Sequence, residues 1–218
     1  MKVSVWLYAV IGLADASALR PRENAAVPSP HASAWRPKSK DPQFFNLRVD
    51  DKCSEGEAAS ACPFAGYAIR LQGGNAIATP YNKWWDPKLP MLFVDDDTKC
   101  YTVSKKPLQL YVNTVDGSLR YAPVGWLPAN SVAISFYKTG DNPEGLVDPS
   151  PAYFSWPSTE GRTNQFFAGS WWLCPMSGTG QYKVYISDYN FGDAAPGGET
   201  KEGCTRKSLA AVNADPWG

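Results

Sequence analysis

Short runs of alternating apolar and polar side chains fill the chain from residue 44 to its end. In an extended strand successive side chains point to opposite faces, so each run predicts a strand with one buried face. The clearest runs flank glycine-containing turns and cover residues 67–71, 76–79, 108–115 and 119–121. Only one short segment, 207–213, has a pattern that favours a helix. The pattern therefore predicts an all-β fold, a single compact antiparallel domain.

Three glycines mark turns at regular intervals of 44 residues: Gly73, Gly117 and Gly161. The pair Asp116-Gly117 is typical of a two-residue hairpin, in which both turn positions take a positive φ. Each turn precedes a further strand-like run, at 91–94, 132–137 and 182–186. Three such units predict a closed barrel of the β-trefoil kind, and a plain antiparallel β-sandwich is the alternative.

The first 18 residues have the three parts of a secretory signal peptide. Lys2 supplies the positive charge, residues 3–13 are mostly apolar, and Ala16-Ser17-Ala18 is a small-residue cleavage site. The apolar run is shorter than the roughly 20 residues that a membrane-spanning helix needs. Residues 19–43 are rich in proline and basic side chains and predict a linker or pro-segment. The β domain then comprises residues 44–218, and we expect a secreted protein, extracellular or in a cell wall.

The composition narrows the classes of partner. Aromatic residues make up 13% of the chain and charged residues 19%, which favours a β-rich extracellular domain. Lys and Arg number 21, as do Asp and Glu, so the chain lacks the basic excess of a nucleic-acid-binding protein. We therefore expect a monomer that binds no nucleic acid, does not span a membrane and carries no cofactor.

Five cysteines follow the signal segment, and in a secreted chain most of them are expected to form disulfides. We predict the pairs Cys62–Cys100 and Cys174–Cys204, with Cys53 unpaired. Cys53 in place of Cys62 is the alternative for the first pair. Each disulfide is expected to stabilise the fold by about 2–4 kcal/mol.

The sole histidine, His31, lies in the linker, so the folded domain lacks the imidazole that many catalytic and zinc sites require. We therefore expect a protein that is not an enzyme and has no metal site. Only a pair of carboxylates, as in glycoside hydrolases, could perform catalysis here. The acidic residues available in the domain are mostly neighbours of Gly, Asn or Pro, as turn residues are: Asp116, Asp141, Glu144, Asp148, Glu160 and Asp188.

Two pairs of adjacent tryptophans are the candidate ligand-binding residues. Trp84 and Trp85 lie on an expected loop, whereas Trp171 and Trp172 lie in a strand-like run. In a strand one of the two indoles packs in the core and the other faces water. An exposed indole offers an apolar face for stacking on a sugar ring, with a polar N–H at its edge. The alternative is that all four indoles pack in the core or cover the ends of the barrel.

The segment around Cys174 resembles a known family. The run 166–175 ends in Cys174-Pro175, the aromatic strand 180–186 follows, and Gly203-Cys204 comes after a Gly/Pro-rich loop. This order is similar to the secreted fungal cell-wall protein family named for phialide development (PhiA), some of whose members are IgE-binding allergens. The hairpin at 116–121 and the segment from Cys62 to Tyr67 are also similar, so that the likeness spans about residues 60–212. The resemblance implies secretion, wall association and no catalytic residues.

Three functional hypotheses follow. The first is a non-enzymatic fungal cell-wall protein that binds wall polysaccharide through exposed aromatic side chains. The second is a secreted effector or elicitor that acts on a component of a host surface. The third is a carbohydrate-active hydrolase that uses paired carboxylates. Three features depart from the family pattern and leave room for the second hypothesis: the basic linker 19–43, Cys53 and the tryptophan pairs.

Overall fold

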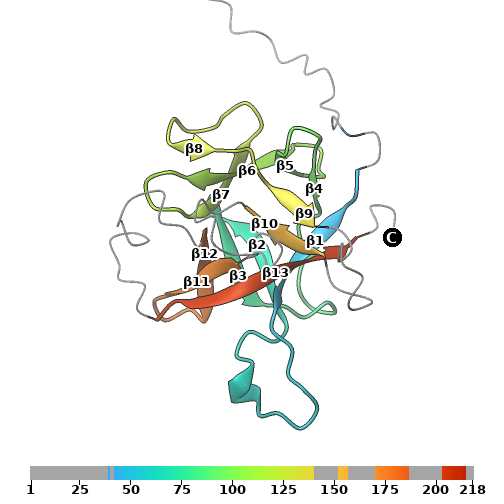
Figure 1. Cartoon of the computed structure of the whole chain (residues 1–218), viewed down its shortest axis with the longest axis vertical. Helices are drawn as coiled ribbons and strands as arrows, with labels where there is room; N and C mark the ends of the chain where they lie inside the picture. Colours follow the sequence, from blue (N-terminus) through green and yellow to red (C-terminus); the bar gives the residue numbers. More distant parts are fainter. Residues whose placement is uncertain (1–38, 40–41, 140–151, 157–169, 187–202, 215–218) are drawn as a thin grey trace, which may run out of the picture. The chain divides into compact units, whose positions relative to one another are not determined.

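The computed structural model of the 218-residue chain describes residues 39, 42–139, 152–156, 170–186 and 203–214 (Figure 1). The chain separates into two units, residues 1–35 and 36–218, and every described residue belongs to the second. The signal segment, His31 and most of the linker therefore lie outside the described residues. The part that is described contains no helix long and apolar enough to cross a membrane.

The described residues form thirteen strands and one short 3-10 helix. The strands are β1 (Phe45–Asp50), β2 (Tyr67–Gln72), β3 (Asn75–Pro80), β4 (Leu92–Val94), β5 (Cys100–Thr102), β6 (Leu108–Asn113), β7 (Leu119–Pro123), β8 (Ser131–Val132), β9 (Tyr137–Thr139), β10 (Tyr153–Ser155), β11 (Ser170–Met176), β12 (Gln181–Ile186) and β13 (Thr205–Asn213), and the helix is Ala59–Ala61. The all-β prediction is confirmed.

Nine strands close into an antiparallel barrel in the order β1-β4-β5-β6-β7-β3-β12-β11-β13. The ring closes where β13 pairs with β1 over six residue pairs, from Phe45↔Asn213 to Asp50↔Ser208. Closure satisfies backbone groups that an open sheet would leave unpaired at its edges. Of the other strands, β2 pairs with both β1 and β3, β8 pairs with β6, and β10 and β9 extend from β13. The closed barrel, and not the sandwich, is the architecture.

The three units predicted from the glycine spacing do not take equivalent places in this barrel. After the first hairpin β4 pairs with β1 and β5, after the second β8 pairs with β6, and β12 pairs with β3 and β11. The third turn, at Gly161, lies outside the described residues. The described strands therefore share closure with a trefoil but not a threefold pattern of pairing.

Two local expectations need correction. Residues 207–213 belong to β13 and are not helical, because six backbone pairs with β1 outweigh a weak local preference. The turn at Asp116-Gly117 is wider than a two-residue hairpin: strand pairing ends at Val112↔Leu119, and only Gly117 has a positive φ, of 71°. The two-residue hairpin is found instead at Gly73-Gly74, where both φ angles are positive.

A column of stacked aromatic rings lies in the core of the barrel. Phe154 lies between Phe136 and Trp171, with ring centroids 5.4 and 5.5 Å away and nearly parallel planes. The indole N–H of Trp171 donates a hydrogen bond to the Phe154 carbonyl oxygen at 2.8 Å. All three side chains are fully buried, so Trp171 belongs to the core and is not a ligand-binding residue.

The disulfides are Cys53–Cys62 and Cys174–Cys204, and Cys100 is a free buried thiol. The second pair matches the prediction, but the first does not: Cys62 pairs with Cys53 and not with Cys100. Cys100 lies on β5 among the core side chains, whereas Cys53 and Cys62 close a loop that projects from the opposite end of the barrel (Figure 1). Because Cys62 is bonded to Cys53, it is not available to Cys100.

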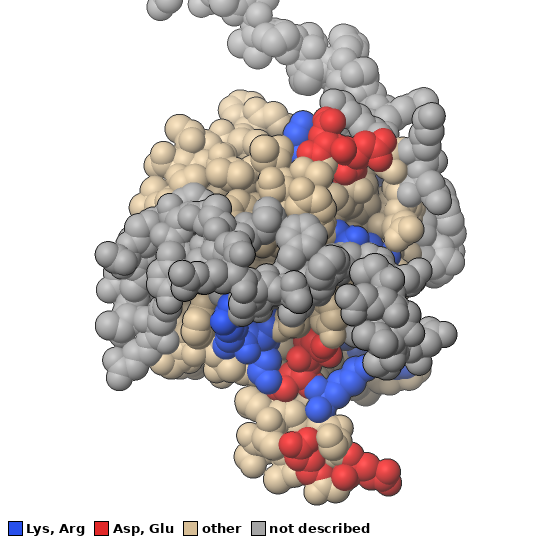
Figure 2. Space-filling view, viewed as in Figure 1, with Lys and Arg blue, Asp and Glu red and all other residues tan. Residues whose placement is uncertain are grey.

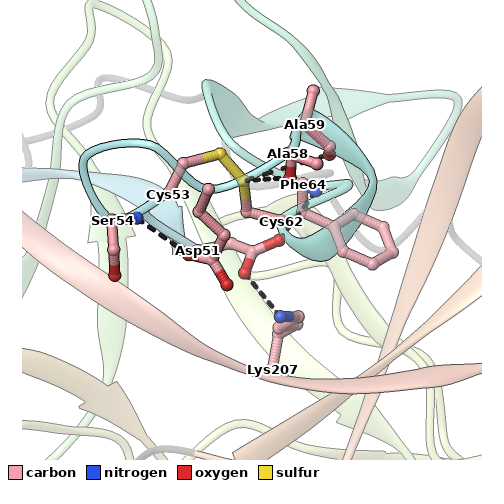
Figure 3. Close-up of a disulfide and its surroundings, with 9 residues drawn as sticks. Asp51, Cys53, Ser54, Ala58, Ala59, Cys62, Phe64 and Lys207 are labelled. Carbon is pink, nitrogen blue, oxygen red and sulfur yellow. Dashed lines mark hydrogen bonds and ion pairs between the residues drawn. A yellow bond between two sulfur atoms is a disulfide. The ribbon is translucent and has the colours of Figure 1, made fainter.

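The base of this disulfide loop is fixed to the barrel through Asp51 (Figure 3). Its carboxylate accepts a hydrogen bond from the Phe64 backbone N–H at 2.8 Å and pairs with Lys207 of β13 at 2.6 Å. Asp51 lies just before Cys53, and Phe64 lies just after Cys62. The same carboxylate therefore holds both ends of the loop against β13.

Candidate functional site

A groove of about 750 Å³ lies between the β3–β4 loop and strands β1, β2, β5 and β6. One wall is apolar and includes Leu71, Leu89, Met91, Val103 and Leu108. Polar groups come from Asn46, Arg70, Tyr81, Lys88, Thr102 and Ser104. This volume lies in the range of small-molecule binding sites, which are also mostly apolar with a few polar groups.

The β3–β4 loop is shaped by hydrogen bonds around Asn82. The Asn82 side-chain oxygen accepts the Trp84 backbone N–H at 2.9 Å, and its backbone oxygen accepts the N–H groups of Trp85 and Asp86. The Asp86 carboxylate in turn accepts the Asn82 N–H at 2.7 Å. Asn and Asp side chains commonly close turns in this way. The backbone that carries the two tryptophans is therefore held in one turn.

The loop is attached to the barrel by Asp86. Its carboxylate lies 2.9 Å from the guanidinium of Arg70, which projects from β2 and lines the groove. The hydrogen bond from the Asn82 N–H, and then the Arg70 guanidinium, hold the pKa of Asp86 below its ordinary value. Tyr81 adds a second attachment, since the guanidinium of Arg48 lies 4.4 Å from its ring centroid and that of Arg70 lies 5.8 Å away.

The structure places Trp84 and Trp85 on this loop with 76% and 85% of their surface exposed. The loop on which the sequence predicted them is thus present, and these two indoles do not pack in the core. Tyr81 and Pro87, on either side of the pair, both line the groove. The turn that carries the two indoles therefore borders the groove, although neither indole is among its lining residues. The Lys83 ammonium lies 4.6 Å from the Trp84 ring centroid, so Trp85 presents the more accessible face.

The second tryptophan pair does not form part of this site. Trp171 is in the core, and Trp172 is half-buried on the opposite face of β11, where Arg206 lies 6.0 Å from its ring. The expectation that one indole of a strand pair faces inward and the other outward is correct here. None of the four indoles is among the residues that line the groove. Trp84 and Trp85 differ from the second pair because they are strongly exposed and belong to a loop that borders the groove.

A third exposed indole among the described residues was not predicted from the sequence. Trp126, on the β7–β8 loop, has 78% of its surface exposed. It lies between Pro123, Gly125 and Pro128, a turn-rich context like that of the Trp84–Trp85 pair. These surrounding turn residues are the sequence signal that predicts an exposed loop here. Figure 1 shows β8 at the top of the view and the end of β3 toward the bottom, so the two loops lie apart.

Of the candidate catalytic carboxylates only Asp116 is among the described residues; the five at 141, 144, 148, 160 and 188 lie outside them. Asp116 accepts hydrogen bonds from the backbone and hydroxyl of Ser118 and pairs with Arg120 at 2.7 Å and Lys183 at 3.7 Å. Burial acts to raise the pKa of Asp116, but these hydrogen bonds and the Arg120 charge outweigh it, and the pKa is lowered. Asp116 therefore stabilises the β6–β7 turn.

The lining of the groove combines apolar side chains with two cations, Arg70 and Lys88. None of the described residues lining it is Asp or Glu, and no cluster of metal-ligating side chains occurs within the ranges that the structure describes. Comparison with protein-family models, characterised proteins and solved structures found no match to this chain. The function must therefore be argued from the groove and its indoles.

Proposed function

We propose that this is a secreted, non-enzymatic cell-wall protein that binds wall polysaccharide through the Trp84–Trp85 loop and the adjoining groove. The main observation that supports this proposal is the pair of adjacent indoles, which are 76% and 85% exposed. They lie on a turn that the Arg70–Asp86 ion pair attaches to the barrel. Large exposed aromatic side chains on a soluble domain are typical of contact surfaces. A flat indole matches the apolar face of a pyranose ring.

The fixed turn favours binding over simple exposure. A ligand that stacks on a mobile loop must order that loop, which costs about 0.5–1.5 kcal/mol for each immobilised side chain. Here the hydrogen bonds of Asn82 and Asp86 order the backbone before any ligand arrives. The binding energy of the indoles is then not spent on arranging the loop.

Secretion and the lack of catalysis rest on separate features. Two disulfides are compatible with an oxidising compartment outside the cytosol. The sole histidine, His31, lies in the linker. The described lining of the groove contains no carboxylate that could act as a general acid. Sugar release from any wall polymer, lost on replacement of one carboxylate, would contradict this part of the proposal.

The test is retention of the mature protein on insoluble β-glucan, chitin and polygalacturonate. We expect at least one polymer to retain the protein and Trp85→Ala to reduce retention, with a larger loss for the double variant Trp84→Ala/Trp85→Ala. Trp126→Ala is the matched control, because it removes an equally exposed indole from another loop. Equal retention of wild type and double variant, or no retention of the wild type, would refute the proposal.

A further inference from the structure

We infer that the groove and the adjoining Trp84–Trp85 loop select carboxylated polysaccharide, a polymer that contains uronic acid units. This inference rests on the proposed function and adds the class of ligand. It begins from an imbalance of charge around the β3–β4 loop. The loop itself carries two cations, Lys83 and Lys88, and one carboxylate, Asp86. Arg48 of β1 and Arg70 of β2 approach it through Tyr81 and Asp86.

The one carboxylate is already engaged. Asp86 pairs with Arg70 and accepts the Asn82 backbone N–H, so its charge is directed toward the barrel and the turn. Lys83 lies over the Trp84 ring, and Lys88 lines the groove. The positive charge near the indoles therefore exceeds the negative charge that this loop supplies, and an anionic ligand would be attracted to it.

The two arginines have hydrogen-bonding capacity that the fold does not use. Arg48 and Arg70 both lie near the ring of Tyr81, and the Nε of each is buried without an acceptor among the described residues. A buried donor without an acceptor is unfavourable, and hydrogen bonds between guanidinium and carboxylate are among the strongest in proteins. Arg70 also lines the groove, so a ligand carboxylate bound there would approach this guanidinium.

The indoles and the cations are adjacent in a way that suits a single sugar unit. Trp85 directly precedes Asp86, whose carboxylate contacts the guanidinium of Arg70, so the exposed indole is carried beside a cation of the groove. A uronic acid unit has both features in one ring, an apolar face for stacking and a carboxylate at C6. A neutral sugar would stack equally well but would bring no charge of its own toward the cations of the groove.

The surroundings of Trp126 can be compared with those of the Trp84–Trp85 loop. Figure 2 shows no Lys, Arg, Asp or Glu over the upper left of the view, where β7 and β8 lie. Trp126 is carried by the loop between these two strands. Among the described residues, exposed indoles occur on the β3–β4 and β7–β8 loops, and those of the β3–β4 loop lie on a loop with several cations around it. Charge, and not only stacking, distinguishes the groove.

The test compares two ligands that differ only in charge. Affinity is measured by calorimetry for oligogalacturonate and for the same oligomer fully methyl-esterified, at 50 and 500 mM salt. We expect about tenfold weaker binding of the ester, since removal of the ligand charge removes several ionic contacts at once. We also expect the affinity for the acid form to fall at high salt. Parallel titrations with β-linked glucuronate oligomers show which polymer supplies the carboxylates, and binding of either acid supports the inference.

Variants assign the effect to the groove. Lys88→Gln and Lys83→Gln should each weaken binding of the acid form about two- to fivefold and leave binding of the ester unchanged. Lys52→Gln is the matched control, because Lys52 is an exposed lysine of the disulfide loop. Equal loss with Lys52→Gln would indicate diffuse charge attraction and overturn the inference.

The remaining outcomes separate the two proposals. If acid and ester bind equally and both depend on Trp85, the inference fails and the proposed function stands. If Trp85-dependent retention occurs on β-glucan or chitin alone, the inference of a carboxylated ligand also fails and the proposed function stands. If no polymer is retained, both proposals fail.

Discussion

Asp86 of the β3–β4 loop and Arg70 of β2 form an ion pair with 2.9 Å between Oδ1 and Nη2. The same carboxylate closes the turn by accepting the Asn82 N–H. One side chain therefore both shapes the loop and attaches it to the barrel. Because both partners are partly exposed, the pair contributes little to global stability. Its main consequence is the position of Trp84 and Trp85.

Asp86→Asn should lower retention on polysaccharide and change the melting temperature little. Asparagine keeps an acceptor for the Asn82 N–H but loses the charge that pairs with Arg70. Since the folded pKa of Asp86 is lowered, the ion pair persists above the ordinary Asp pKa and is lost as the pH falls through the folded value. Retention of the wild type should therefore decline in strong acid toward that of the variant. Asp96→Asn, at an exposed residue of the β4–β5 turn, is the control and should behave as wild type.

Trp171→Ala should destabilise the fold by about 3–5 kcal/mol, because it removes a buried indole and leaves a cavity. It also leaves the Phe154 carbonyl without its donor. Trp85→Ala should change the free energy of unfolding by no more than about 0.5 kcal/mol, as exposed substitutions usually do. Urea unfolding followed by far-UV circular dichroism measures both. Similar stability of the two variants would contradict the placement of Trp171 in the aromatic column.

Asp116→Asn should cost about 1–3 kcal/mol at neutral pH, since the carboxylate accepts charge-assisted hydrogen bonds in a partly buried turn. Its folded pKa is lowered, so this stabilisation is present above the unfolded pKa and is lost as the pH falls through the folded one. The difference between wild type and variant should therefore shrink in acid. Unfolding midpoints from pH 7 to 2 test this, and a difference that grows in acid would show the opposite sign of coupling.

Cys100 should resist alkylation in the folded protein and react once the chain is unfolded without reductant. The thiol is fully buried, and burial, followed by the charge of Asp95, raises its pKa well above the ordinary value. Thiolate is the reactive form, so both effects suppress labelling. Peptide mass spectrometry should find a single label at Cys100 and disulfide-linked peptides for the other four cysteines. A label on Cys53 would restore the pairing predicted from the sequence.

Much of the strand content follows from the sequence alone. Alternation locates β2, β3, β6 and β7 to within a few residues, because a period of two is a local property of an extended chain. The loop that carries Trp84 and Trp85 is also local, since the surrounding prolines and Asn82 interrupt any strand. The Cys174–Cys204 pair agrees with the structure as well.

Two errors have different causes. Residues 207–213 form a strand because β1, more than 150 positions earlier, offers six backbone partners that local preference does not show. Cys62 pairs with Cys53, nine positions away, while β5 carries Cys100 into the core. The cysteine prediction therefore passed over a near neighbour in favour of a distant residue.

The sequence by itself determined the class of fold, the strands around the glycine turns and the exposed tryptophan loop, since each depends on neighbouring residues. Only the tertiary structure decided the order of strands in the barrel, the burial of Trp171, and the gathering of Arg48, Arg70 and Lys88 around the loop. These cations come from β1, β2 and the β3–β4 loop, and no local pattern relates them. The pairing of β2 with both β1 and β3 brings the two arginines together around Tyr81.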